Sequence, residues 1–422
     1  MSEFFNYSEK TEKLGKEALA AVKPYFEKIE EISEYNQQKM LKAFIDNGVS
    51  ETMFFGSSGY GYDDRGRETI DRVFAQAVGA EDAIVRHNFT CGTHTLAVAL
   101  FGVLRTGDTM LCVTGTPYDT IHSVIGINGA GKGEGSLFEY GISYKQLDLK
   151  DGKIDIEGIE KTVDENITMV YIQRSRGYDL RRSFSVSEIG EAVRAAKKKN
   201  KNVIVMVDNC YGEFVEKTEP VSVGADMIAG SLIKNPGAGI ARTGGYIAGR
   251  HDLIEKCSFR LTTPGLGREV GATLGMSREL FMGIYYAPSA VKEALKTAVF
   301  TAKLFELMGY DVTPKSDETR HDIIQAIKLC NAVNLTAFCR GMQKGAPVDS
   351  FVTPEPSDMP GYDSKVIMSA GAFTLGSSIE LSADAPLREP YAVWMQGGTI
   401  FNSAKTGILF AAEEVLKANG KI

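Results

Sequence analysis

The chain has few of the features that mark secreted, membrane-spanning or nucleic-acid-binding proteins. Its six cysteines form no CxxC pair and follow no framework spacing, so they are predicted to be reduced core residues. No apolar run approaches the roughly 20 residues that a membrane-spanning helix needs. The net charge is −7 and no basic block occurs, which argues against a nucleic-acid-binding surface.

The N-terminal segment MSEFFNYSEK does not read as a signal peptide, because acidic residues interrupt what should be an apolar stretch. Internal repeats and low-complexity tracts are also missing from the sequence. We therefore expect a soluble, cytoplasmic protein that binds neither nucleic acid nor membrane.

A chain of 422 residues is too long to fold around one ordinary hydrophobic core, and it is long enough for two or three subdomains. Residues 9–48 have helical periodicity without strand signals, which predicts an N-terminal helical arm within residues 1–55. Residues 56–285 are predicted to form a large domain. Residues 286–422 are predicted to form a smaller α+β domain that ends in a helix over 403–418.

Short apolar strands alternate with helices between residues 80 and 250. The strands lack inside–outside alternation, which is typical of a mostly parallel sheet covered by helices on both faces. Ligands of such sheets bind at the carboxyl ends of the strands. The predicted strands cover residues 83–85, 110–113, 169–172 and 203–207, and the predicted helices cover 67–78, 93–103 and 186–198.

The segment around Lys234 gives the clearest indication of a catalytic site. Ser231 precedes it, a glycine-rich turn follows it, and Asp208 ends the apolar run 203–207 upstream. Pyridoxal 5′-phosphate (PLP) chemistry needs an amine for a Schiff base, an anion against the pyridinium nitrogen, and donors for the phosphate. A surface lysine beside a turn is the alternative for Lys234 alone. The conjunction of lysine, aspartate, hydroxyl and glycines favours the Schiff-base interpretation.

The segment 91–94, Cys-Gly-Thr-His, opens the helix that follows the first predicted strand. The N-terminus of a helix offers free N–H groups and a positive dipole end, which suits a phosphate. His94 resembles a metal ligand, but no other His or Cys stands at ligand spacing with an acidic partner. We therefore expect no metal, and expect His94 to pack near the cofactor or to cap the helix.

From about residue 50 onward the chain resembles the fold-type I PLP-dependent enzymes. The resemblance rests on the segments 56–65 (GSSGYGYDDR), 231–237 (SLIKNPG) and 243–249 (TGGYIAG). These are similar to the cysteine- and methionine-metabolism lyases, and within them to the methionine γ-lyase-like family also called aluminium-resistance proteins. The resemblance implies an α/β fold of the PLP-dependent transferase type, whose large, PLP-binding domain has a mostly parallel seven-stranded sheet flanked by helices.

The resemblance also implies a role for each matching residue of the cofactor site. Lys234 is the implied Schiff-base lysine, which also moves the proton of the substrate Cα. Asp208 keeps the pyridine nitrogen protonated, which makes the ring an electron sink. Gly92, Thr93 and Ser231 are the implied phosphate donors.

Two tyrosines have implied roles against the cofactor ring. Tyr118 matches the aromatic residue that stacks on the pyridine face and also acts as an acid or base; a turn tyrosine is the alternative. Tyr211 has the D-x-x-Y spacing of aspartate aminotransferase-like enzymes, in which the tyrosine hydrogen-bonds the 3′-oxygen of the cofactor. Lyases of this group differ at that position, so a packed aromatic residue is the alternative for Tyr211.

The loop before the first sheet strand resembles the region in which related lyases have a Tyr-x-Arg that reaches the phosphate of the neighbouring subunit. Tyr60 or Tyr62 with Arg65 is the predicted pair, although the spacing is not reproduced. The resemblance therefore implies a homodimer or homotetramer whose active sites are shared between subunits.

An amino-acid substrate needs a planar, bidentate partner for its α-carboxylate, and arginine provides one. Arg388 matches the region of the C-terminal domain in which the superfamily places this residue. Arg176, which follows the predicted strand 169–172, is the second candidate.

Together these assignments imply a PLP-dependent carbon–sulfur lyase that acts on a sulfur amino acid, by elimination of the methionine γ-lyase or cystathionine β-lyase type. An aminotransferase or aldolase reaction is the alternative within PLP chemistry, and a scaffold without turnover is the alternative outside it. Nucleotide binding is disfavoured, because the glycines of 56–61 follow no strand and no GxxxxGK[ST] pattern occurs. The sequence leaves open the substrate, β- or γ-elimination, dimer or tetramer, and any physiological link to aluminium.

Overall fold

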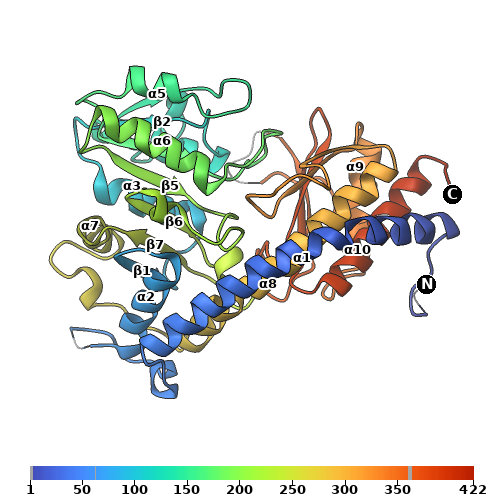
Figure 1. Cartoon of the computed structure of the whole chain (residues 1–422), viewed down its shortest axis with the longest axis horizontal. Coiled ribbons are helices and arrows are strands. Elements are labelled where there is room, and N and C mark those ends of the chain that lie inside the picture. Colours follow the sequence, from blue (N-terminus) through green and yellow to red (C-terminus); the bar gives the residue numbers. More distant parts are fainter. Residues whose placement is uncertain (1–2, 62, 360–363) are drawn as a thin grey trace.

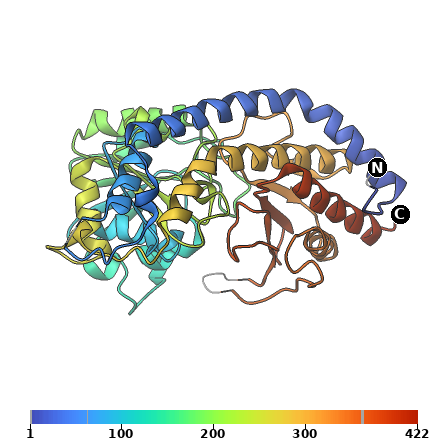
Figure 2. The same cartoon turned by 90° about the horizontal axis from the view of Figure 1, so that it is seen from below.

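A long N-terminal helix connects the two domains of the molecule (Figures 1 and 2). The computed structural model describes residues 3–61, 63–359 and 364–422. Helix α1 (Glu9–Asp46) lies along α8 (Ser277–Leu307). Its N-terminal part places Ala18 and Val22 in the core of the small domain, and its C-terminal part places Met40 and Ala43 in the core of the large domain. The predicted arm is thus shared by both cores.

The large domain contains a seven-stranded sheet that is mostly parallel. Strand β7 is antiparallel to both of its neighbours, and the remaining pairs are parallel. The strands, in their order across the sheet, are β1 (Asp82–Arg86), β7 (Gly245–Gly249), β6 (Met227–Ser231), β5 (Ile204–Asp208), β4 (Met169–Gln173), β2 (Thr109–Cys112) and β3 (Ser143–Gln146).

Helices cover both faces of this sheet, which explains why its strands read as continuous apolar runs. On β5, Val205 and Val207 face one core and Met206 faces the other. The Met206 face packs against α3 (Gly92–Val103) and α7 (His251–Leu261), and the Val207 face against α2 (Arg65–Val78), α5 (Ile156–Thr162) and α6 (Val186–Lys199).

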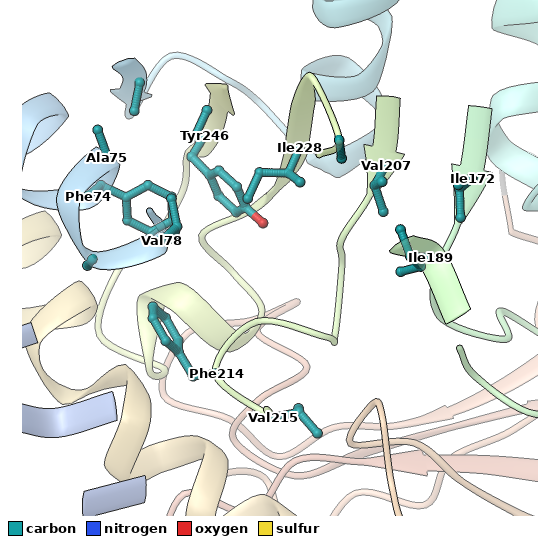
Figure 3. Close-up of a cluster of buried hydrophobic side chains, with 14 of the residues drawn as sticks. Phe74, Ala75, Val78, Ile172, Ile189, Val207, Phe214, Val215, Ile228 and Tyr246 are labelled. Carbon is teal, nitrogen blue, oxygen red and sulfur yellow. The ribbon is translucent and has the colours of Figure 1, made fainter. Parts of the chain in front are cut away.

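The core on the Val207 face is shown in Figure 3. Phe74 of α2 packs on the ring of Tyr246 of β7, with 4.5 Å between the ring centroids. Ile228 and Ile172 extend the cluster across β6 and β4. Complete burial of one such side chain stabilises the fold by about 1.5–3 kcal/mol, so the strand ends that bear the site are held by a rigid core.

The small domain is built on an antiparallel sheet of five strands. Helices α9 (Ala332–Lys344) and α10 (Phe401–Ala418) pack together beside it. The strands, in their order across the sheet, are β10 (Val366–Ser369), β11 (Ser382–Pro386), β12 (Ala392–Gln396), β9 (Gln325–Lys328) and β8 (Asp311–Thr313).

The remaining helical segments are short connections. They are α4 (His122–Ile125) and the 3₁₀ helices η1 (Glu51–Phe54), η2 (Asp119–Ile121), η3 (Ile127–Gly129), η4 (Phe138–Tyr140), η5 (Pro220–Val223), η6 (Asn235–Gly237) and η7 (Gly267–Glu269). In the described part of the chain, no helix combines the length and the apolar character needed to cross a membrane.

The predicted fold class is confirmed, with its mostly parallel seven-stranded sheet and its smaller α+β domain. Strands β3, β6 and β7 were not predicted from the apolar pattern, since β7 contains two glycines and half of β3 is exposed. The predicted division between residues 285 and 286 falls inside α8, which runs from one domain into the other.

Candidate active site

A pocket lies at the carboxyl ends of β4, β5 and β6, where a parallel sheet is expected to bind its ligand. Its walls come from both domains: the large domain supplies the strand ends and the turns after them, and the small domain supplies residues of its antiparallel sheet. The lining residues are Tyr118, Gln173, Ser175, Gly177, Tyr178, Asp208, Cys210, Tyr211, Lys234, Ile324, Asp384, Trp394 and Gln396.

Lys234 follows β6 by three residues and precedes η6, so its side chain rises from a turn into the pocket. Its Nζ lies 4.4 Å from the centre of the Tyr211 ring. Burial by itself lowers the pKa of Lys234, but Cys210, Tyr211 and Asp208 around it raise that pKa above its usual range. The lysine therefore lies among groups that favour its charged form.

Asp208 is the last residue of β5 and is 6% exposed. Its neighbours on the adjacent strands are Gln173 of β4 and Ala229 of β6. The carboxylate accepts a hydrogen bond from the Cys210 N–H at 3.1 Å. Burial raises the pKa of Asp208, and the nearby Lys234 ammonium opposes the rise. A buried carboxylate of this kind is suited to a cationic ring nitrogen.

The first turn of α3 lies directly beside Lys234. A Cβ atom added to Gly92 would be 3.4 Å from Ser231 Cβ and 3.8 Å from Lys234 Nζ. The first N–H groups of a helix have no partner inside the helix, and this helix begins next to the lysine and the serine. Thr93 Oγ1 shares a hydrogen bond with Thr120 Oγ1 at 2.7 Å. Ser231 is fully buried behind Gly92.

The residues present thus fit PLP. The pocket contains an amine and a buried carboxylate, and the N-terminus of a helix of 12 residues lies beside the amine. These groups match the aldehyde, the ring nitrogen and the phosphate of that cofactor. Cys91 caps α3, because its Sγ accepts from the His94 N–H at 3.3 Å. His94 Nδ1 instead pairs with the N–H of Thr90 at 3.1 Å, so His94 does not cap the helix.

Tyr118 lines the same pocket and is fixed through its backbone. Its N–H donates to Gln173 Oε1 at 2.6 Å, and Gln173 in turn lies beside Asp208 in the sheet. The Tyr118 ring meets the edge of Tyr178 with 5.5 Å between centroids. Its stacking role and its acid–base role stay predictions.

Tyr211 occupies the pocket wall below Lys234. Its backbone has φ of +69°, a conformation that a bulky residue rarely adopts, and its hydroxyl donates to Ser378 Oγ at 3.2 Å. Burial raises the pKa of Tyr211 to about 12, with Lys234 opposing. The ring is thus held by both domains, and its contact with the cofactor oxygen stays a prediction.

A buried arginine holds the turn that follows Asp208. Arg174 is fully buried, and its Nη1 donates to Asn209 Oδ1 at 2.8 Å and to the Gly212 carbonyl at 2.9 Å. It also forms ion pairs with Glu216 at 2.8 Å and Glu219 at 3.3 Å. Loss of one member of a buried ion pair costs about 3–5 kcal/mol, so this network is a strong constraint on the position of Asp208.

The loop 60–67 does not line the pocket of its own chain. Tyr60 is 70% exposed and Arg65 is also exposed, whereas Tyr62 lies outside the described residues. Arg67 is buried instead, and its Nη1 donates to the carbonyls of Gly59 and Gly271. The assignment of Tyr60 and Arg65 to a neighbouring subunit stays a prediction.

Neither arginine predicted to bind a carboxylate lines the pocket. Arg388 follows β11 and is exposed. Arg176 is buried between Ser175 and Gly177, both of which do line the pocket. Its Nη1 donates to the Thr313 carbonyl at 2.8 Å, while Nη2 has no hydrogen-bond partner among the described residues. Both assignments stay predictions.

Sequence reasoning missed most of the wall that faces Lys234. Gln173 ends β4, so the rule that ligands bind at strand ends would have indicated it. Asp384, Trp394 and Gln396 belong to β11 and β12 of the other domain, and no motif marks them. Only the packing of the two domains brings them to the pocket.

Known proteins resemble this chain over nearly its whole length. Residues 11–416 of the chain match the methionine gamma-lyase family. It is 46% identical over 418 residues to the uncharacterized protein YnbB of Bacillus subtilis (strain 168), with 99% of each chain covered. It is 51% identical to a carbon–sulfur lyase involved in aluminum resistance from Clostridium novyi NT, with a TM-score of 0.92 and 96% of each chain covered.

A more distant structure shares the fold alone. The pyridoxal-5′-phosphate-dependent protein YhfS of Escherichia coli has a TM-score of 0.62 at 15% identity, with 93% of this chain and 97% of its own covered. The family match covers most of the chain, the relatives align over nearly their whole length, and the solved structure shares the fold. The chain belongs to the methionine gamma-lyase family and has the fold of type I PLP-dependent enzymes.

Proposed function

We propose that the protein is a PLP-dependent carbon–sulfur lyase that acts on a sulfur amino acid. The observation that carries this proposal is that Lys234 and Asp208 line one pocket and that the N-terminus of α3 lies beside Lys234. Membership of the methionine gamma-lyase family supports it, as does the relative from Clostridium novyi described as a carbon–sulfur lyase.

PLP, when bound, supplies an electron sink for the negative charge that develops at the substrate Cα. Lys234 would provide the amine that holds the cofactor, and the same amine would take the proton from the substrate Cα. The Asp208 carboxylate keeps a proton on the ring nitrogen through its negative charge. The first turn of α3, with Ser231 beside it, binds the phosphate and fixes the orientation of the ring.

The departing sulfur requires a proton donor on the substrate side. Tyr118 lines the pocket together with Lys234, and its hydroxyl is our candidate for this donor. Elimination from the γ carbon requires a second deprotonation at Cβ, so one group must reach both sides of that step. Elimination from the β carbon needs only the proton transfer at Cα.

The α-carboxylate of the substrate requires a guanidinium. Arg176 has support from its burial next to the pocket and from its Nη2, which lacks a hydrogen-bond partner among the described residues. A buried donor left unpaired is costly, so this group has capacity for a ligand oxygen. Arg388 is the alternative; its exposed position would require a rearrangement or a second subunit.

We further propose a cytoplasmic homodimer or homotetramer with shared active sites. Tyr60 and Arg65 are exposed and lie outside their own pocket, which leaves them available to a partner. The six cysteines, all of them described, form no disulfide, in keeping with a reducing compartment. Within each subunit, residues 56–285 are the proposed cofactor-binding unit, with the arm 1–55 and the small domain 286–422 closing it.

A substrate screen tests the proposed reaction. The purified, PLP-loaded protein is incubated with methionine, cystathionine, cysteine and homocysteine. Release of 2-oxo acid is measured for each, together with thiol from the two thioethers and hydrogen sulfide from the two thiols. We expect both products from at least one thioether or thiol substrate. Amino transfer or aldehyde formation without thiol release would contradict the lyase and favour the other PLP reactions.

A further inference from the structure

The wall of the pocket opposite Lys234 is acidic and aromatic. Asp384 of β11 and Trp394 and Gln396 of β12 form it together with Tyr178 of the large domain. Apart from Lys234, no described residue that lines this pocket is cationic. The wall therefore has no side chain that would attract a second carboxylate. It has one side chain, Asp384, that would attract a cation.

The contacts of the Asp384 carboxylate leave it without a permanent cationic partner. Gln396 Nε2 donates to Oδ2 at 3.2 Å, and the nearby Tyr178 side chain lowers the pKa of the carboxylate. Both of these side chains are neutral. Lys234 acts on Asp384 through its charge, but the proposed chemistry commits that lysine to the cofactor. Burial raises the pKa of Asp384, as expected of a carboxylate that lacks a neutralising group.

Aromatic rings lie beside this carboxylate in a fixed arrangement. The ring of Tyr178 lies 5.5 Å from that of Tyr118 and 5.3 Å from that of Trp394, measured between centroids. Trp394 Nε1 donates to the Asp179 carbonyl at 3.2 Å, which holds the indole in place. Aromatic faces next to a carboxylate attract an ammonium ion through the ring quadrupole and the full charge.

We propose that Asp384, with the rings of Tyr178 and Trp394, binds an ammonium group on the departing half of the substrate. This inference rests on the proposed lyase function. It selects a thioether of two amino-acid halves, of which cystathionine is the available probe, over a thioether such as methionine, whose departing group is uncharged methanethiol. The methyl group of that substrate would leave the carboxylate desolvated and without a cationic partner, which disfavours methionine.

Two sulfur-free analogues isolate the ammonium group. The first is the L,L-diamino diacid in which CH2 replaces the sulfur of cystathionine, and the second is the diacid of the same length that lacks one of the two amino groups. Neither has a sulfur to eliminate. The diamino compound is symmetrical, so the test does not depend on β- or γ-elimination. Calorimetric titration of the PLP-loaded protein gives the Kd of each analogue.

The wild type should bind the diamino analogue more tightly than the monoamino analogue. Asp384→Asn should weaken the diamino analogue by roughly 30-fold or more, because a charge-assisted contact is lost. The same variant should change the Kd of the monoamino analogue by less than about threefold. Asp384→Glu, which keeps the charge, should retain part of the preference. Asp311→Asn, on the same sheet but outside the pocket, is the matched control and should change neither Kd.

Equal losses for both analogues in Asp384→Asn would overturn the proposal, since Asp384 would then support the pocket in general. An unchanged preference in that variant, or a wild type that does not distinguish the analogues, would overturn it as well. Failure of the proposed lyase function is a separate outcome: the PLP-loaded wild type would then release no thiol in the substrate screen, whatever the two Kd values.

Discussion

The two halves of the pocket are built in different ways. The large-domain half consists of residues at the ends of parallel strands, such as Asp208 and Lys234, each next to a short, recognisable segment. The small-domain half consists of Asp384, Trp394 and Gln396, which lie inside two antiparallel strands without a motif. The difference separates two tasks: the parallel sheet holds the groups that every substrate needs, and the second sheet offers the groups that distinguish one substrate from another.

The division predicts that a change in the large-domain half abolishes turnover of every substrate. Lys234→Ala should remove the visible absorbance of the bound cofactor and all measurable activity, because no amine remains to hold the cofactor or to take the Cα proton. In the wild type, borohydride reduction should fix the cofactor on Lys234, as mass spectrometry of the peptide would show. The exposed Lys201→Ala is the control. Full activity in Lys234→Ala would mean that another lysine carries the cofactor.

The next largest effect is expected from Asp208→Asn. The amide has the shape of the carboxylate but not its charge, so it cannot keep the ring nitrogen protonated. We expect the cofactor to bind and kcat/KM to fall by about 10³-fold, by a similar factor for every substrate. Activity equal to that of the wild type would assign the ring nitrogen to a different partner. A loss of kcat/KM for only one substrate would contradict the proposed division of tasks between the two halves of the pocket.

The shared-site proposal extends the comparison to a second subunit. If Arg65 completes the partner's pocket, Arg65→Ala and Lys234→Ala are each inactive, but a hybrid dimer has one site with neither change. Equal mixing with free exchange makes about half of the dimers hybrid, so about a quarter of the wild-type activity should return. Native mass spectrometry establishes that subunits exchange. Exchange without recovery would place Arg65 within its own chain or outside the site.

The smallest effect is expected in the small-domain half. Trp394→Leu keeps an apolar side chain but removes the aromatic face beside Asp384, so kcat/KM for cystathionine should fall by about 10-fold. The effect on methionine should be smaller, and the cofactor absorbance should stay unchanged. Phe373→Leu, an exposed position of the same domain, is the control. A loss of the cofactor band in Trp394→Leu would show that this wall also supports the cofactor.

The elements that were predicted correctly from the sequence have one thing in common: burial or periodicity constrains their local pattern of residues. Helix α1 was predicted within residues 9–48 and is observed over Glu9–Asp46, because helical periodicity over 38 residues is a strong signal. Strands β4 and β5 were predicted because burial on both faces requires continuous apolar runs. Strand β3 was missed because half of it is exposed at the edge of the sheet, where burial does not constrain composition.

The sequence by itself determined the fold class, because buried parallel strands need continuous apolar runs between helices. The resemblance of a few short segments to a known family implied the family and the candidate cofactor residues Lys234 and Asp208. Only the tertiary structure decided what faces them. Helix α8 runs from one domain into the other and α1 packs in both cores, so the antiparallel sheet is held against the strand ends of the large domain. That packing brings Asp384 and Trp394 to Lys234 across more than 140 residues of chain, a distance over which no periodicity or motif carries information.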